Sequence, residues 1–146
     1  MWRQWQRISN YIHSIQTYQD MSPDVSQRRQ VNQILQKRPS LSPKDWCAEF
    51  KLDAPMQADR LPDVLLFMQR SLAAHSGLEF ARVRPQDRLV EDLHFPLVCW
   101  FDWSTRFCDD VLNQWQVDIG DCFDETRIYT VADLANFLAV ALAPSP

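Results

Sequence analysis

The sequence predicts an all-α protein, and three observations indicate this fold class. Only two of the 146 residues are glycine, whereas sheets joined by tight hairpins use glycine at positive φ. Hydrophobic residues make up 46% of the chain and include six Trp and eight Phe, which is enough apolar surface for a packed core. Apolar residues recur at spacings of three and four in several segments, as they do on one face of a helix.

The first predicted helix lies in the segment WRQWQRISNYIHSI, residues 2–15. The apolar residues that would share one face are Trp2, Trp5, Ile8, Ile12 and Ile15. Arg3 and Arg7 lie beside this face, so the helix would be amphipathic. Such a helix could pack on the rest of the chain, dock into a groove of a partner protein or lie on an anionic membrane. The pattern leaves these three alternatives open.

Two further helices are predicted before residue 60. In the first, Ser22 can cap the helix, Pro23 fits its first turn and Pro39 should end it. In the second, Ser42 and Pro43 repeat this arrangement. The residues expected on the buried faces of these helices are Val31, Ile34, Leu35, Trp46 and Phe50.

A domain boundary is predicted at the polar segment 51–60, which has no clear period. We therefore expect an N-terminal helical extension over residues 1–60 and a helical domain over residues 61–146. The extension carries nine Lys and Arg against six Asp and Glu, a balance of +3, and the domain carries six against thirteen, a balance of −7. An acidic domain should repel nucleic acid and favour a basic protein partner. A solvated acidic surface that only maintains solubility is the alternative.

Three helices are predicted within residues 61–146. The first begins near Leu61 and ends at Gly77, which can adopt the left-handed conformation of a helix end. The second should start at Pro96, and the third should start at Thr130, whose spacing from Asp133 suits a capping box. The apolar residues at helical spacing are Leu61, Leu65, Met68, Leu72, Trp100, Trp103, Phe107, Val111, Trp115, Val131, Leu134, Phe137, Leu138 and Leu142.

The second part of the chain resembles the acyl carrier protein family. The resemblance rests on elements in the family's order: a long first helix, a long loop, DRLVEDL at residues 87–93, an acidic second helix that closes with QVDI at residues 116–119, a short third segment, and a last helix opened by TVADL at residues 130–134. It implies a four-helix bundle preceded by the N-terminal helical extension. In this family, a serine just after the EDL element carries the phosphopantetheine arm.

The serine that would carry the arm is missing. Counting forward from Leu93 by the family's spacing leads to Leu97, and counting back from Ile119 leads to Phe101. The two positions differ by about one helical turn. The nearest serine, Ser104, lies inside the predicted helix. We therefore expect a scaffold kept for its surface, without a cofactor, and a working carrier modified at Ser104 is the alternative.

The sequence contains no recognisable pattern for catalysis or metal binding. The four cysteines form no CxxC pair, and two glycines cannot build a phosphate loop. Cys99 and His94 could form a dyad, but cysteine is commonly a buried apolar residue. The acidic pairs at residues 109–110 and 124–125 favour a solvated face over a cation site, because adjacent carboxylates on a helix point apart. We expect no enzyme, no cofactor and no metal ion.

The sequence therefore predicts a cytoplasmic adaptor or assembly factor that binds another protein. No apolar run of about 18 residues indicates a membrane span, and the start, MWRQWQR, lacks the apolar stretch of a signal peptide. In carrier proteins the second helix is the surface that partners recognise, and the resemblance transfers this role to the acidic second helix and the loop before it. The predicted partner-binding residues are Asp102, Asp109, Asp110, Trp100, Trp103, Trp2 and Trp5. A peripheral membrane protein is a further alternative.

The aromatic cluster at the start of this helix leaves one question to the structure. Trp100, Phe101 and Trp103 cannot all face the same direction on a helix. One of them would then be exposed and could anchor a partner, since Trp is enriched at binding hot spots. Complete burial in the core is the alternative.

Overall fold

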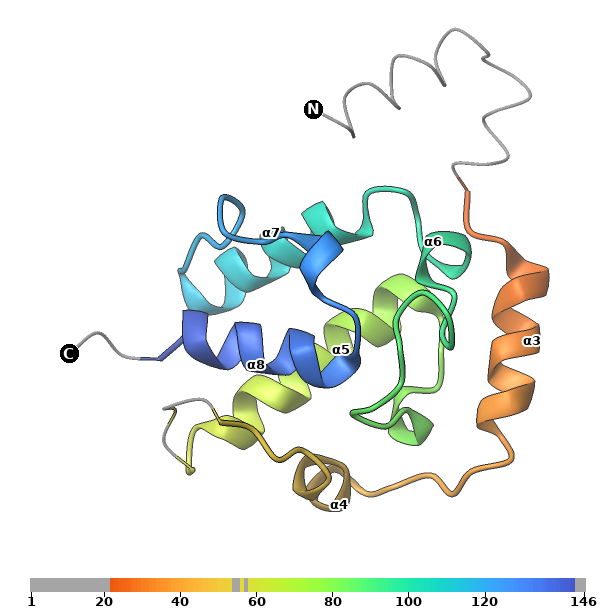
Figure 1. Cartoon of the computed structure of the whole chain (residues 1–146), viewed down its shortest axis with the longest axis horizontal. Helices are drawn as coiled ribbons and strands as arrows, with labels where there is room; N and C mark the ends of the chain where they lie inside the picture. Colours follow the sequence, from red (N-terminus) through yellow and green to blue (C-terminus); the bar gives the residue numbers. More distant parts are fainter. Residues whose placement is uncertain (1–21, 54–55, 57, 144–146) are drawn as a thin grey trace, which may run out of the picture.

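The computed structural model describes residues 22–53, 56 and 58–143 (Figure 1). Its helices are α3 (Val25–Leu35), α4 (Pro43–Ala48), α5 (Leu61–Ser76), α6 (Phe95–Val98), α7 (Trp103–Trp115) and α8 (Val131–Ala141), with 3-10 turns η1 (Phe80–Arg82) and η2 (Glu125–Arg127). In this part of the chain, extended pairing is limited to one isolated bridge between Arg88 and Thr130. The described residues are thus all-α, as predicted. The helix predicted over residues 2–15 lies outside them.

The helix α5 is central to the fold, and α4, α7, α8 and η1 all contact it. Its buried side chains include Leu65, Met68 and Leu72, which recur at spacings of three and four and form one face. It ends at Gly77, where φ is 70° and the N–H donates to the carbonyl of Ala73 at 2.9 Å. The predicted apolar face and the predicted end of this helix are both confirmed.

The helices α3 and α4 contribute to the same hydrophobic core as the later helices. The core cluster contains Val31 and Leu35 of α3 together with Trp46 of α4 and residues of α5, α7 and α8. Trp46 is fully buried, and its indole N–H donates to the carbonyl of Val83 at 2.9 Å. The described N-terminal helices therefore pack on the C-terminal part, whereas a separate domain ending at residue 60 remains a prediction.

The caps at the starts of α4 and α8 are those predicted from the sequence, and the cap of α3 is not. Ser42 caps α4, and Thr130 forms a capping box with Asp133 at the start of α8. The cap of α3 is Asp24 and not Ser22, because the Asp24 carboxylate accepts the N–H of Gln27 at 3.0 Å. The two side chains that α3 buries, Val31 and Leu35, lie one turn apart on one face of the helix.

Ile34 was predicted to be buried, and this prediction is wrong, since its side chain is exposed.

Another prediction that is wrong is the continuous helix starting at Pro96. The helix α6 ends at Val98, Cys99 is extended, and α7 begins only at Trp103. The last carbonyls of α6 are bonded by residues of the α3 region instead of by a following helical turn, and this pairing stabilises the break.

Those bonds come from the start of α3. The Asp24 N–H donates to the carbonyl of Leu97 at 2.8 Å, and the guanidinium of Arg28 donates to the carbonyl of Val98 at 2.7 Å. Arg28 also reaches the carbonyl of His75 at 3.3 Å. The α3 helix thus lies beside both α6 and the end of α5 (Figure 1).

Candidate interaction surface

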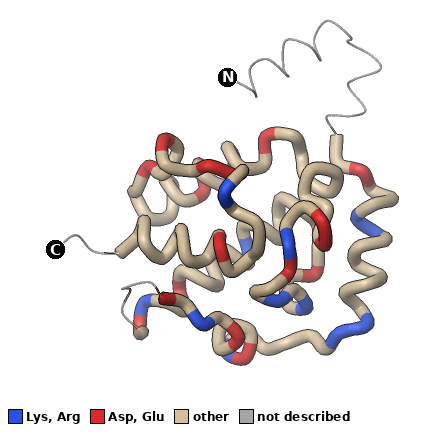
Figure 2. Tube along the Cα trace, viewed as in Figure 1, with Lys and Arg blue, Asp and Glu red and all other residues tan. Residues whose placement is uncertain are grey.

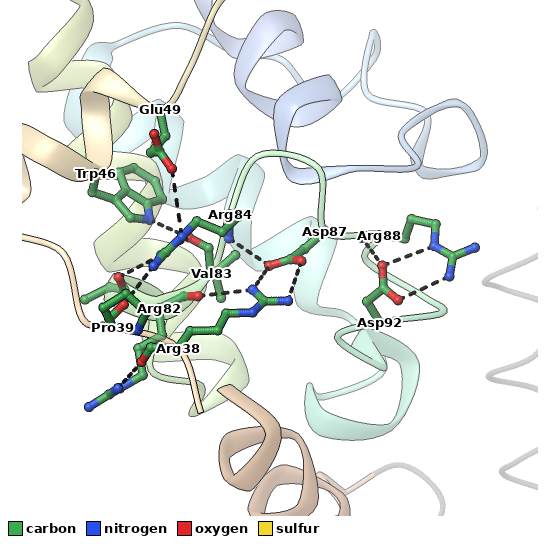
Figure 3. Close-up of polar contacts among 11 residues, drawn as sticks. Arg38, Pro39, Trp46, Glu49, Arg82, Val83, Arg84, Asp87, Arg88 and Asp92 are labelled. Carbon is green, nitrogen blue, oxygen red and sulfur yellow. Dashed lines mark hydrogen bonds and ion pairs between the residues drawn. The ribbon is translucent and has the colours of Figure 1, made fainter. Parts of the chain in front are cut away.

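Asp87 is the centre of a polar network in the connection between α5 and α6 (Figure 3). Its carboxylate, in a residue only 4% exposed, accepts two hydrogen bonds from Arg38 at 2.7 and 3.0 Å. A third comes from the N–H of Arg84 at 2.7 Å. The hydrogen bond to Asp87 raises the pKa of Arg38. A buried carboxylate bonded by both prongs of a guanidinium is a structural support with defined geometry.

Other arginines near this network bond backbone carbonyls. Arg84 donates to the carbonyl of Pro39 at 2.7 Å, Arg38 donates to the carbonyl of Arg82 at 3.1 Å, and Arg82 donates to the carbonyl of Arg38. These contacts join the segment after α3 to the connection after η1. The positive charges of these three arginines are held in internal contacts, whereas other cations of this part of the chain, such as Lys37 and Lys44, are exposed.

Asp110, one of the predicted partner-binding residues, faces α5. The Ser71 hydroxyl donates to its Oδ2 at 2.7 Å, and Nε2 of His75 lies 2.8 Å from the same oxygen. Both partners belong to α5, so the carboxylate joins two helices. Asp110 is therefore less suited to steering a partner than its position beside Asp109 indicated.

Asp102, the N-cap residue of α7, and Asp109 lie seven residues apart, a spacing that places them on one face of a helix. The Asp102 carboxylate accepts from Nε of Arg106 at 3.0 Å, and Asp109 is exposed. Leu112, three residues further along, is also exposed. This outer side of α7 combines a carboxylate, an ion pair and an apolar residue, which is a composition found at the rim of protein interfaces.

The structure separates the predicted tryptophans. Trp103 is 7% exposed and packs edge-to-face on Phe95, with ring centroids 5.0 Å apart. Trp100 is 37% exposed, and the guanidinium of Arg106 lies 5.7 Å from its ring centroid. Trp103 is thus a core residue and Trp100 is the aromatic residue on the surface. Trp2 and Trp5 lie outside the described residues.

Additional acidic residues lie in the connection between α7 and α8 (Figure 2). Three of them, Asp118, Asp121 and Asp124, are exposed. Hydrogen bonds from the hydroxyl and the N–H of Thr126 lower the pKa of Asp124. Sequence reasoning weighed only the 124–125 pair, as cation ligands, and did not assign this connection to the partner surface. Among the described residues, no group of three or more His, Cys, Asp and Glu side chains could hold a metal ion.

Neither register of the carrier motif presents a serine for modification. Leu97 and Phe101 occupy the two counted positions. Ser104 is completely buried in the first turn of α7, and no hydrogen-bond partner of its hydroxyl is found in the described part of the chain. Cys99 is also buried, and burial raises the pKa of its thiol to about 12. A thiol that stays protonated at neutral pH is a poor nucleophile.

Comparisons with protein-family models, with curated proteins and with solved structures found no match to this chain. The candidate surface therefore rests on its own geometry. We define the acidic face as the exposed carboxylates of α7 and the α7–α8 connection, which are Asp109, Asp118, Asp121 and Asp124. Trp100 lies beside the start of α7, and no helix of residues 22–143, where described, is long and apolar enough to cross a membrane.

Proposed function

We propose that this protein is a non-catalytic adaptor or assembly factor that binds a basic surface of a partner protein through its acidic face. The observation that carries the proposal is the distribution of charge. Residues 85–143 contain eleven Asp and Glu and three Lys and Arg, a balance of −8, whereas residues 22–84 contain seven and ten, a balance of +3. Several of those basic groups are bonded internally, and the acidic face is exposed.

The resemblance to acyl carrier proteins supports the same surface. The order of α5, a long connection that contains η1 and α6, α7, η2 and α8 agrees with the order of elements that the resemblance implies. In that family the helix corresponding to α7 is the one that partners recognise. A scaffold of this kind without an accessible serine would retain the docking function of the helix and lose the cargo.

The chemistry of the acidic face predicts how the complex would behave. Exposed carboxylates such as Asp109 and Asp121 would mainly accelerate encounter with a basic partner, and salt would weaken this effect. Trp100 would supply an aromatic anchor at the edge of the face, since exposed Trp residues are frequent hot spots. Binding should therefore depend on ionic strength through the carboxylates and on contact area through Trp100.

The test is affinity purification from the native cell, with mass spectrometry of the proteins that co-elute. The triple variant D109N, D118N and D121N should lose a partner that the wild type retains at low salt. The matched control, D45N, D53N and D63N, removes three exposed carboxylates from the other part of the chain and should retain it. Equal retention by both variants, or no effect of raising salt to about 0.5 M, would contradict the proposal.

A working carrier is the rival function, and intact mass separates the two. A phosphopantetheinyl transferase needs an exposed hydroxyl, whereas Ser104 is buried. Incubation of the full chain with such a transferase and its arm donor should leave the mass unchanged. A mass gain of one arm would establish a carrier and remove the argument for an adaptor.

A further inference from the structure

A pocket lies between α5 and α7, at the place where Asp110 contacts α5. Its volume is about 330 Å³, which is at the lower end of the range for small-molecule sites. The residues that line it are Phe67, Arg70, Ser71, Asp110, Asn113 and Gln114. Three belong to α5 and three to α7, and in each helix they follow the i, i+3, i+4 spacing of one face. The pocket is therefore formed where faces of two contacting helices meet.

The lining of the pocket carries both signs of charge. Arg70, an exposed residue, contributes a guanidinium from α5, and Asp110 contributes a carboxylate from α7. Oδ2 of Asp110 lies 2.8 Å from Nε2 of His75, and in the described part of the chain no ion pair joins Asp110 to Arg70. A cation and an anion that line one pocket without pairing can each bind an opposite charge of one ligand.

The carboxylate of Asp110 is held in position by the protein itself. The Ser71 hydroxyl donates to Oδ2 at 2.7 Å, and Nε2 of His75 lies 2.8 Å from the same oxygen. Ser71 is only 7% exposed, whereas the side chain of Asp110 is 38% exposed and can be reached from the pocket. Both contacts fall on Oδ2, so they do not occupy Oδ1. A charged group that is already fixed loses less conformational entropy when a ligand binds.

The other lining residues suit the uncharged part of a ligand. Asn113 and Gln114 are exposed, and their amides can both donate and accept hydrogen bonds. Phe67 is fixed in the core, because its ring packs edge-on against Trp115 with centroids 5.9 Å apart. It supplies an aromatic wall, against which a further ring can pack favourably.

We propose that this pocket binds a small zwitterion, namely an α-amino acid with an aromatic side chain. The ammonium group donates to Asp110, the carboxylate accepts from Arg70, and the side chain lies against Phe67. A ligand that carries only one of the two charges leaves the other charge of the pocket without a partner, so it binds more weakly. The site is separate from the acidic face, and the proposal does not require the partner protein.

An NMR titration of the isotope-labelled full chain with three probes tests the proposal. L-Phenylalanine carries both charges, phenylpropionate lacks the ammonium group, and phenethylamine lacks the carboxylate. L-Phenylalanine should cause saturable shifts at the amides of residues 67–71 and 110–114, in the millimolar range expected for a ligand of this size. The two singly charged probes should bind at least about fivefold more weakly, because each forms one charged contact fewer.

Two substitutions then examine each charge of the pocket separately. Arg70→Gln should weaken the binding of L-phenylalanine about fivefold and leave phenethylamine, which has no carboxylate, unchanged. Asp110→Asn should weaken L-phenylalanine to a similar extent and leave phenylpropionate unchanged. A variant that had lost its fold would instead lose every probe. The control Arg29→Gln removes an exposed guanidinium of α3 and should leave all three affinities unchanged.

Three results would overturn the proposal. One is the absence of saturable shifts at the amides around the pocket when L-phenylalanine is added. Another is equal binding of the three probes, since the pocket would then not distinguish a zwitterion. The third is unchanged binding of L-phenylalanine by Arg70→Gln, whose exposed position makes the substitution compatible with the fold.

Discussion

Three arginines of residues 22–84 and two aspartates of residues 85–143 have different environments. Arg28, Arg38 and Arg84 each donate to backbone carbonyls or a buried carboxylate far away in sequence. By contrast, Asp109 and Asp121 are exposed. The net charge of a segment therefore predicts the charge of its surface only where the charged groups are not already bonded within the fold.

This difference has a physical origin in the two chemical groups. A guanidinium has five donors in a planar fork, so it can join several carbonyls at once. A carboxylate only accepts, and the helix interior offers it few free N–H groups. Where donors are supplied, a carboxylate is also bonded within the fold: Arg38 and the N–H of Arg84 donate to Asp87, and the N–H groups of Tyr129 and Thr130 donate to Asp133.

The largest expected effect concerns the boundary between the two regions. Trp46→Ala should lower the free energy of unfolding by about 3–5 kcal/mol, because it removes a fully buried aromatic side chain. If residues 22–50 and 61–142 form one cooperative unit, a single denaturant transition should shift as a whole. Two transitions, with only the less stable one shifted, would support a separate N-terminal domain. Trp100→Ala is the exposed control and should shift the transition little.

The next effect compares two carboxylates of one connection. Asp87→Asn should cost about 2–3 kcal/mol, because it leaves the Arg38 guanidinium without its buried partner. Asp92→Asn is the matched control, since the hydrogen bond from Arg88 lowers the pKa of Asp92 but this pair is exposed, and it should change the urea midpoint little. Similar shifts for both variants would show that the buried network does not support the fold.

A smaller effect distinguishes the two neighbouring carboxylates of α7. Asp110→Asn should lower the free energy of unfolding by about 1 kcal/mol, because its contacts with Ser71 and His75 join α7 to α5. Asp109→Asn should leave stability unchanged and weaken partner binding. Thermal unfolding and binding measured on the same preparations give the two values. Loss of stability in Asp109→Asn would contradict the assignment of this residue to the acidic face.

The last prediction concerns the reactivity of cysteine thiols in the native protein and involves no change in stability. Cys122 is exposed in the α7–α8 connection and should react first with a maleimide at pH 8. Cys99, beside α6, should react last, because burial raises its pKa to about 12 and the thiolate is the reactive form. Peptide mapping after brief labelling gives the order. Early labelling of Cys99 would show that the contact between α3 and α6 opens readily.

Several parts of the fold were predictable because they depend on neighbouring residues. Ser42 with the N–H of Asp45, and Thr130 with Asp133, are bonds between residues three apart. Gly77 likewise ends α5 through its own backbone conformation. The break between α6 and α7 was not predictable, because the donors that complete α6 lie at Asp24 and Arg28, about 70 residues earlier in the chain.

The candidate surface divides in the same way. Asp109 could be assigned to a solvated face from its place in an acidic helix. The contact of Asp110 with α5 and the burial of Trp103 depend on how α7 is rotated against its neighbours. Trp100 precedes α7 and is exposed. Rotation about a helix axis is decided by the side chains of the other helices that it contacts.

The amino-acid order alone determined the helical class, the caps and the separation of charge, since spacing, turn chemistry and composition act over a few residues. Only the tertiary structure decided which charged side chains are bonded to residues far away in the sequence. The partner of Arg38, Asp87, lies 49 residues away in sequence. The partners of Asp110, Ser71 and His75, lie 39 and 35 residues away. Contacts of that range exist only after the helices have packed, so no local pattern specifies them.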